Sequence, residues 1–186
     1  MSIHLIHGIH TAGSDQAPEY LIQYLPGTVY YPDYGYELAL TTRLINPMIV
    51  GTIEPYVAPG DTLIGHSNGC AIALELVERG APVDGLVFIN AALNAQVKLP
   101  DRILWCDIYF NAGDTVTEAA KVAAALGLVD TTWGEMGHSG YSGRDARVTN
   151  INCGATAGLP AVSGHSDIFS SRCLFGFCQS RMDSVW

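Results

Sequence analysis

The sequence has few basic residues. It contains 9 lysines and arginines against 18 aspartates and glutamates, which gives a formal net charge of −9 over 186 residues. Nucleic-acid backbones and anionic lipid surfaces are bound by clusters of lysine and arginine, and the basic residues here are scattered without a run. The sequence therefore predicts neither a nucleic-acid partner nor a membrane partner.

Paired cysteines and long apolar runs are also missing. The cysteines are odd in number and form no C-x-x-C pair, so neither a disulfide framework nor a zinc knuckle is predicted. No apolar run approaches the length of a membrane span, and the first residues lack the pattern of a signal peptide. We expect a soluble, cytoplasmic protein with reduced, buried thiols. The cysteines are Cys70, Cys106, Cys153, Cys173 and Cys178.

The remaining composition is that of a globular protein. Hydrophobic residues make up 48% of the chain and charged residues 15%. A chain of this length can bury a core without disulfides or metal. No repeat or low-complexity linker divides it, so we expect a single domain over residues 1–186.

Strand and helix patterns alternate along most of the chain. This alternation predicts an α/β fold, a three-layer sandwich on a mainly parallel sheet. A weaker helical signal covers residues 41–56 and is expected to be broken by Pro47 and Pro55. Residues 127–145 are expected to be irregular. Strands are predicted at 3–7, 28–31, 61–65, 85–90, 103–110 and 146–152, and helices at 18–25, 67–79, 117–126 and from 166 onward.

The most informative stretch is Gly65-His66-Ser67-Asn68-Gly69. It joins a short apolar strand to a helical pattern, which is the context of a nucleophile elbow. A turn this sharp brings the strand and the helix nearly into contact, so side chains in place of the two glycines would collide. Ser67 is the candidate nucleophile, and an ordinary glycine-rich turn is the alternative.

A serine needs a base, and the base needs a group that orients it. In a parallel sheet such groups lie on loops at the carboxyl ends of the strands. Asp114 follows the strand predicted at 103–110 and is the candidate acid, although an aspartate before a helix is also a good N-cap. Asp107 is a poorer choice because it lies inside that strand.

Two histidines compete for the role of base, in Gly137-His138-Ser139-Gly140 and Gly164-His165-Ser166-Asp167. His165 is favoured because it lies between the last predicted strand and the closing helix, at a strand end. His138 precedes that strand and is kept as an alternative base or a substrate contact.

Three further histidines, His4, His7 and His10, recur every three residues. Positions an odd number apart on a strand face opposite sides of the sheet, so His4 and His7 are not expected to share an ion. We expect no metal and no cofactor. His66 is expected to pack beside the elbow.

The order Ser67, Asp114, His165 is the serine, acid, histidine order of the α/β-hydrolase fold. The chain resembles a small, lidless member of this superfamily over nearly its whole length. About a dozen residues separate the strands at 85–90 and 103–110, where many members insert a lid. The two antiparallel strands that begin many members are missing. Four segments carry the resemblance: His7-Gly8, 65–69, 111–116 and 164–166.

The resemblance implies an acyl-transfer mechanism. Ser67 would be the nucleophile, His165 the general base and then acid, and Asp114 the residue that holds the imidazole. The oxyanion hole would be formed by the N–H groups of Asn68 and Ile9, with His10 as a neighbouring possibility. The expected substrate is a small-molecule or acyl compound, a carboxylic ester or thioester.

Two other functions fit the same residues. A hydrolase scaffold can serve as a non-catalytic binding or inhibitor protein, since fold alone does not establish activity. The same three residues can also pass an acyl group to an alcohol or amine, as an acyltransferase. No feature of the sequence indicates an oligomeric state.

Overall fold

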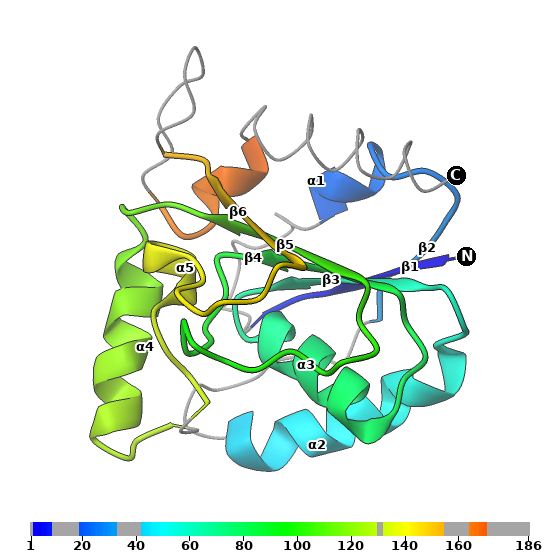
Figure 1. Cartoon of the computed structure of the whole chain (residues 1–186), viewed down its shortest axis with the longest axis horizontal. Helices are drawn as coiled ribbons and strands as arrows, with labels where there is room; N and C mark the ends of the chain where they lie inside the picture. Colours follow the sequence, from blue (N-terminus) through cyan, green and yellow to red (C-terminus); the bar gives the residue numbers. More distant parts are fainter. Residues whose placement is uncertain (1, 9–18, 33–41, 130–131, 155–163, 171–186) are drawn as a thin grey trace.

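The computed structural model describes residues 2–8, 19–32, 42–129, 132–154 and 164–170. Its centre is a six-stranded sheet in the order β2-β1-β3-β4-β5-β6 (Figure 1). Every neighbouring pair of these strands is parallel, which confirms the predicted fold class. The strands are β1 (Ser2–Ile6), β2 (Thr28–Tyr30), β3 (Thr62–His66), β4 (Gly85–Ile89), β5 (Trp105–Phe110) and β6 (Val148–Asn152).

The central strands are buried on both faces, as continuous apolar runs predict. Successive residues of β4 alternate between two cores: Leu86 and Phe88 belong to one, and Val87 and Ile89 to the other. All five residues of this strand are buried. A sheet buried in this way needs a layer of helices on each side.

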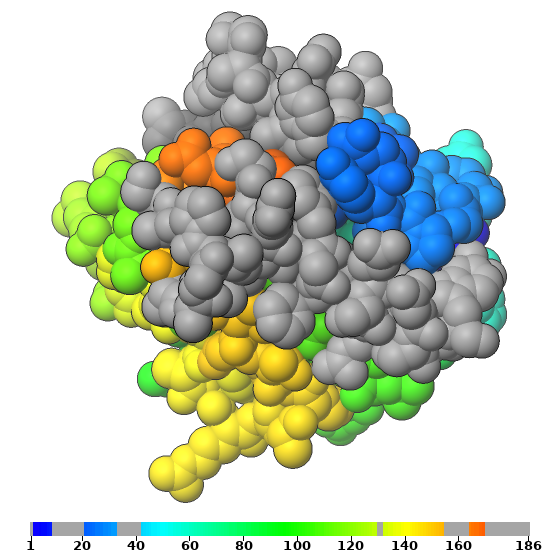
Figure 2. All heavy atoms as spheres, turned by 90° about the horizontal axis from the view of Figure 1, so that it is seen from above, coloured from blue at the N-terminus to red at the C-terminus, as the bar shows by residue number. Residues whose placement is uncertain are grey.

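Helices supply those two layers. In Figure 1, α2 and α3 lie on one face of the sheet, and α1 and η3 lie on the other. Figure 2 shows α1 (blue) and η3 (orange) at the surface of that second face. The helical elements are α1 (Glu19–Ile22), α2 (Thr42–Ile53), η2 (Glu54–Tyr56), α3 (Gly69–Arg79), α4 (Thr115–Ala125), α5 (Met136–Ser139) and η3 (Asp167–Ser170).

The predicted break at Pro47 is wrong, because α2 runs through this residue. Proline removes one backbone donor from a helix and crowds the preceding turn. Here the apolar face of the helix packs into the core shared with α3, and this burial outweighs the local penalty. The break near Pro55 is confirmed, since α2 ends at Ile53 and a 3-10 turn follows. The core residues of α2 are Ile49, Val50 and Ile53.

Other boundaries differ by a few residues. Helix α4 begins at Thr115, two residues earlier than predicted, because Asp114 caps it. The stretch 127–145, predicted to be irregular, contains the short helix α5. The closing helix predicted from residue 166 is described only as η3, and the rest of it lies outside the described residues. Within the described ranges, no helix is both long and apolar enough to cross a membrane.

Candidate active site

Ser67 occupies the sharp turn between β3 and α3. Its φ angle is 55°, a left-handed conformation that a non-glycine residue rarely adopts. Three hydrogen bonds hold this strained backbone: the Ser67 N–H donates to the carbonyl of Ile89 at 3.0 Å, and its carbonyl accepts from the N–H groups of Cys70 and Ala92, both at 3.2 Å. Strain at a candidate functional residue persists only when its surroundings enforce it.

The glycines on either side of Ser67 are required by contact with backbone atoms. A Cβ on Gly65 would lie 2.7 Å from the backbone nitrogen and Cα of Cys70. A Cβ on Gly69 would overlap the carbonyl oxygens of Ile6 and His7, at the end of β1. The crowding inferred from the sequence is therefore present, and it involves a neighbouring strand as well as the helix.

The loop after β1 comes into contact with the serine. A Cβ on Gly8 would lie 2.6 Å from the Cβ of Ser67 and 3.2 Å from its Oγ. Only glycine allows this approach without a shift of the loop or the serine. The next residues, Ile9 and His10, lie outside the described residues, so their roles at an oxyanion stay predictions.

Asn68 follows Ser67 at the start of α3, and its side chain is held by Asn46 of α2. The two amides exchange hydrogen bonds: Asn46 Nδ2 donates to Asn68 Oδ1 at 3.0 Å, and Asn68 Nδ2 donates to Asn46 Oδ1 at 2.9 Å. Both side chains are buried. Asn46 was not predicted as a site residue, because it lies in the stretch with the weaker helical signal.

The two carboxylate oxygens of Asp114 have different partners. Oδ1 accepts hydrogen bonds from the N–H groups of Val116 and Thr117, both at 3.1 Å, which caps α4. Oδ2 accepts from Nδ1 of His165 at 2.8 Å. Asp114 is fully buried, so the capping and the histidine contact that the sequence offered as alternatives occur together.

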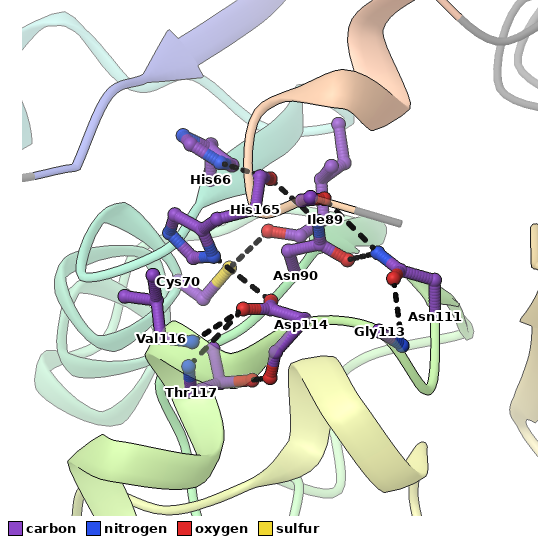
Figure 3. Close-up of polar contacts among 11 residues, drawn as sticks. His66, Cys70, Ile89, Asn90, Asn111, Gly113, Asp114, Val116, Thr117 and His165 are labelled. Carbon is purple, nitrogen blue, oxygen red and sulfur yellow. Dashed lines mark hydrogen bonds and ion pairs between the residues drawn. The ribbon is translucent and has the colours of Figure 1, made fainter. Parts of the chain in front are cut away.

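His165 is thus the histidine that contacts Asp114 (Figure 3). A carboxylate only accepts, so Nδ1 carries the proton of the neutral ring and Nε2 keeps its lone pair. The ring packs against that of His66, with centroids 4.9 Å apart, and His66 in turn contacts Phe169 edge to face. His165 therefore lies beside the residue that precedes Ser67.

His66 is a buried, neutral neighbour in this cluster. Burial is the main cause that holds the pKa of His66 well below its usual range, and the nearby His165 adds to the shift. Its Nε2 lies 3.5 Å from the carbonyl oxygen of His165. The expected packing of His66 beside the elbow is confirmed.

Two asparagines at strand ends contact the His165 turn, as Figure 3 shows. Nδ2 of Asn90, directly after β4, donates to the carbonyl of His165 at 2.6 Å. Nδ2 of Asn111, directly after β5, lies 3.3 Å from both the carbonyl of Gly164 and Oδ1 of Asn90. Both side chains are fully buried. They were not predicted as site residues, because an asparagine at a strand end is also an ordinary turn residue.

His138 lies in α5, and none of the hydrogen bonds described above involves its side chain. Its Nδ1 is buried with no hydrogen-bond partner among the residues that the structure describes. The neighbouring Gly137 packs against Asn90: its N–H donates to the carbonyl of Ala91 at 2.9 Å, and its carbonyl accepts from the N–H of Asn111 at 3.0 Å. Gly137 of α5 therefore packs against the strand ends that carry Asn90 and Asn111. A catalytic or substrate-binding role of His138 stays a prediction.

Two of the histidines considered as metal ligands, His4 and His7, have structural partners. His4 is buried against Asp61, with 3.0 Å between Nε2 and Oδ2, and Nδ1 of His7 lies 2.8 Å from the carbonyl of Gly8. Over the described ranges, no group of three or more histidines, cysteines and acids could hold a metal ion. Cys70 is a buried thiol behind the elbow, and burial raises its pKa.

Comparison with known proteins yields structural neighbours only. No family model matches the chain, and no curated protein matches it either. The chain is similar to α/β hydrolase domain-containing protein 10 from mouse, with a TM-score of 0.61 and 13% identity over 100% of this chain and 90% of that one.

Two microbial structures are similar as well. A predicted CIB-like hydrolase from Thermoplasma acidophilum has a TM-score of 0.55 and 14% identity, over 99% of this chain and 85% of that one. A protein of Xanthomonas campestris assigned to the α/β hydrolase superfamily has a TM-score of 0.55 and 18% identity, over 96% of this chain and 98% of that one. Together with the parallel sheet, these neighbours show that the chain has the α/β-hydrolase fold.

Proposed function

We propose that this protein of the α/β-hydrolase fold is a serine hydrolase that cleaves a carboxylic ester or thioester. The hydrogen bond of 2.8 Å between His165 Nδ1 and Asp114 Oδ2 is the main support. It joins the candidate base to the candidate acid, and the ring of His165 packs against His66, the residue that precedes Ser67. Ser67 itself has a backbone φ of 55°.

The chemistry follows from these partners. Nε2 of His165 takes the proton of the Ser67 hydroxyl while Oγ attacks the carbonyl carbon of the substrate, and the buried carboxylate of Asp114 stabilises the imidazolium that forms. The imidazolium then gives its proton to the leaving alcohol or thiol, which leaves an acyl group on Ser67. Water, activated by His165 in the same way, releases the acid and restores the serine.

The negative oxygen that develops during attack needs donors. The backbone N–H of Asn68 is proposed as one, because it follows the nucleophile at the start of α3, where the helix dipole is positive. The N–H of Ile9 is proposed as the other. In support, Gly8 brings the loop that leads to Ile9 into contact with Ser67.

Labelling with a fluorophosphonate probe tests the proposal. The wild-type protein should be labelled at Ser67, and Ser67→Ala should abolish both labelling and ester turnover. Ser142→Ala is the matched control, because Ser142 is an exposed serine in the loop before β6. Well-folded wild-type protein that takes up no probe and hydrolyses no ester or thioester would refute the proposal. Adding an alcohol or amine acceptor then shows whether water or the acceptor takes the acyl group.

A further inference from the structure

His165 lies in a turn between β6 and η3, outside any helix or strand. The hydrogen bonds between strands therefore do not fix the backbone of His165. Its ring nevertheless has to reach Asp114, which is 51 residues away in sequence. A base within a turn still has to be held in one orientation, since a misplacement of about 1 Å can cost about 10²-fold in rate. The contacts of the turn with the strand ends are therefore decisive.

Asn90 makes the shortest of these contacts. Its Nδ2 donates to the carbonyl oxygen of His165 at 2.6 Å, and its side chain is fully buried. The backbone of Asn90 has a φ of 43°, a left-handed conformation in which asparagine is better tolerated than most residues. This conformation is fixed in part by its N–H, which donates to the carbonyl of Tyr109 on β5 at 2.9 Å.

Asn111 connects the turn of the acid with the turn of the base. Its Oδ1 accepts from the N–H of Gly113 at 3.0 Å, and its backbone carbonyl accepts from the N–H of Asp114 at 3.1 Å. Its Nδ2 faces both the carbonyl of Gly164 and Oδ1 of Asn90, at 3.3 Å each. These acceptors have no protons to give, so the amide NH₂ must point at them.

We propose that Asn90 and Asn111 are positioning residues, which clamp the Gly164-His165 backbone so that the imidazole keeps its hydrogen bond to Asp114. The inference rests on the proposed function and deepens it. Neither side chain touches the reacting atoms in this arrangement. Both act on the base through its backbone carbonyls, from the ends of two adjacent strands that are themselves buried.

The test uses Asn90→Gly and Asn90→Asp. Glycine accepts the left-handed φ without strain but has no amide, so it removes the clamp and keeps the backbone conformation. Aspartate keeps the shape and, when ionised, places an acceptor against the carbonyl of His165. We expect each variant to lower kcat by about 10²-fold with little change in KM, because substrate binding does not involve the amide.

A spectroscopic readout separates positioning from general support. An imidazole N–H proton that is hydrogen-bonded to a carboxylate gives a strongly downfield NMR signal. The signal of the Nδ1 proton of His165 should be present in wild type and absent in His165→Ala. We expect it to be lost or broadened in Asn90→Gly. Asn150→Ala is the matched control: Asn150 also bridges to a loop backbone, donating to the carbonyl of Tyr141 at 2.7 Å and accepting from its N–H at 2.9 Å.

Two results would overturn the proposal. One is Asn90→Gly with the downfield signal intact and kcat within about threefold of wild type. The other is Asn150→Ala with the same loss of kcat and signal, which would mean that general destabilisation explains both. If wild type shows the signal but neither hydrolyses esters nor takes up the fluorophosphonate, the proposed function fails while the NMR comparison still decides the positioning role. A double variant with Asn111→Ala should lose less than the product of the two single effects, since both act on one turn.

Discussion

Replacing Asp114 by asparagine should separate the two roles of this residue, the capping of α4 and the hydrogen bond to His165. Its Oδ1 caps α4 through Val116 and Thr117, and its Oδ2 accepts from His165. Asparagine retains a carbonyl oxygen for the cap, and it is as good an N-cap as aspartate. It places an NH₂ group where Oδ2 was, which turns an acceptor for the His165 proton into a donor.

The expected sizes of the two effects are very different. The amide favours the tautomer of His165 with its proton on Nε2, which cannot accept the proton of Ser67. The equivalent change in a serine protease lowers kcat about 10⁴-fold, or about 5.5 kcal/mol in activation free energy at 1.36 kcal/mol per factor of ten. The unfolding free energy should fall by about 1 kcal/mol or less, since the cap remains and only the charge next to the helix dipole is lost. Asp114→Ala should lose about 1 kcal/mol more, because the cap is then missing.

Ester turnover and urea denaturation of the three proteins measure these quantities. Asp101→Asn, an exposed aspartate in the loop before β5, serves as the control and should change neither. The reasoning would be refuted if Asp114→Asn kept turnover within tenfold of wild type. It would also be refuted if Asp114→Asn were as destabilising as Asp114→Ala, since the cap would then not have survived.

Three other predictions follow from the contacts around Ser67. Gly8→Ala should lower the rate of fluorophosphonate labelling by about 10²-fold, because its Cβ would lie 2.6 Å from that of Ser67; Gly51→Ala, where a Cβ meets nothing within 4 Å, should leave labelling unchanged. His66 stays neutral when folded, so the unfolded chain binds more protons below about pH 6.5, and the unfolding free energy should fall with decreasing pH by up to about 1.4 kcal/mol per unit. Urea titrations of wild type and His66→Phe at pH 7 and pH 5 should show the shallower pH dependence in the variant, and equal slopes would contradict the assignment. His165→Ala should abolish ester turnover while His138→Ala retains it, and the reverse result would make His138 the base.

Much of the architecture could be read from local patterns. The continuous apolar run at β4 indicated burial on both faces, and the structure places its successive residues in two cores. The elbow was recognisable because its requirements are local: a strand, two glycines, a serine between them and a helix at once. Pro47 was misread for the same reason, since a local penalty was visible in the sequence and the burial of α2 that offsets it was not.

Local patterns in the sequence were enough to predict the α/β class, the elbow at Ser67 and a short list of candidate acids and bases at strand ends. The tertiary structure was needed to tell which histidine contacts Asp114, because the two candidates have nearly the same neighbours in sequence but occupy different positions in the fold. It also revealed Asn90 and Asn111, whose partners at His165 and Gly164 lie 75 and 53 residues away in sequence. Contacts over such separations arise from the order of the strands in the sheet, and no local sequence pattern indicates them.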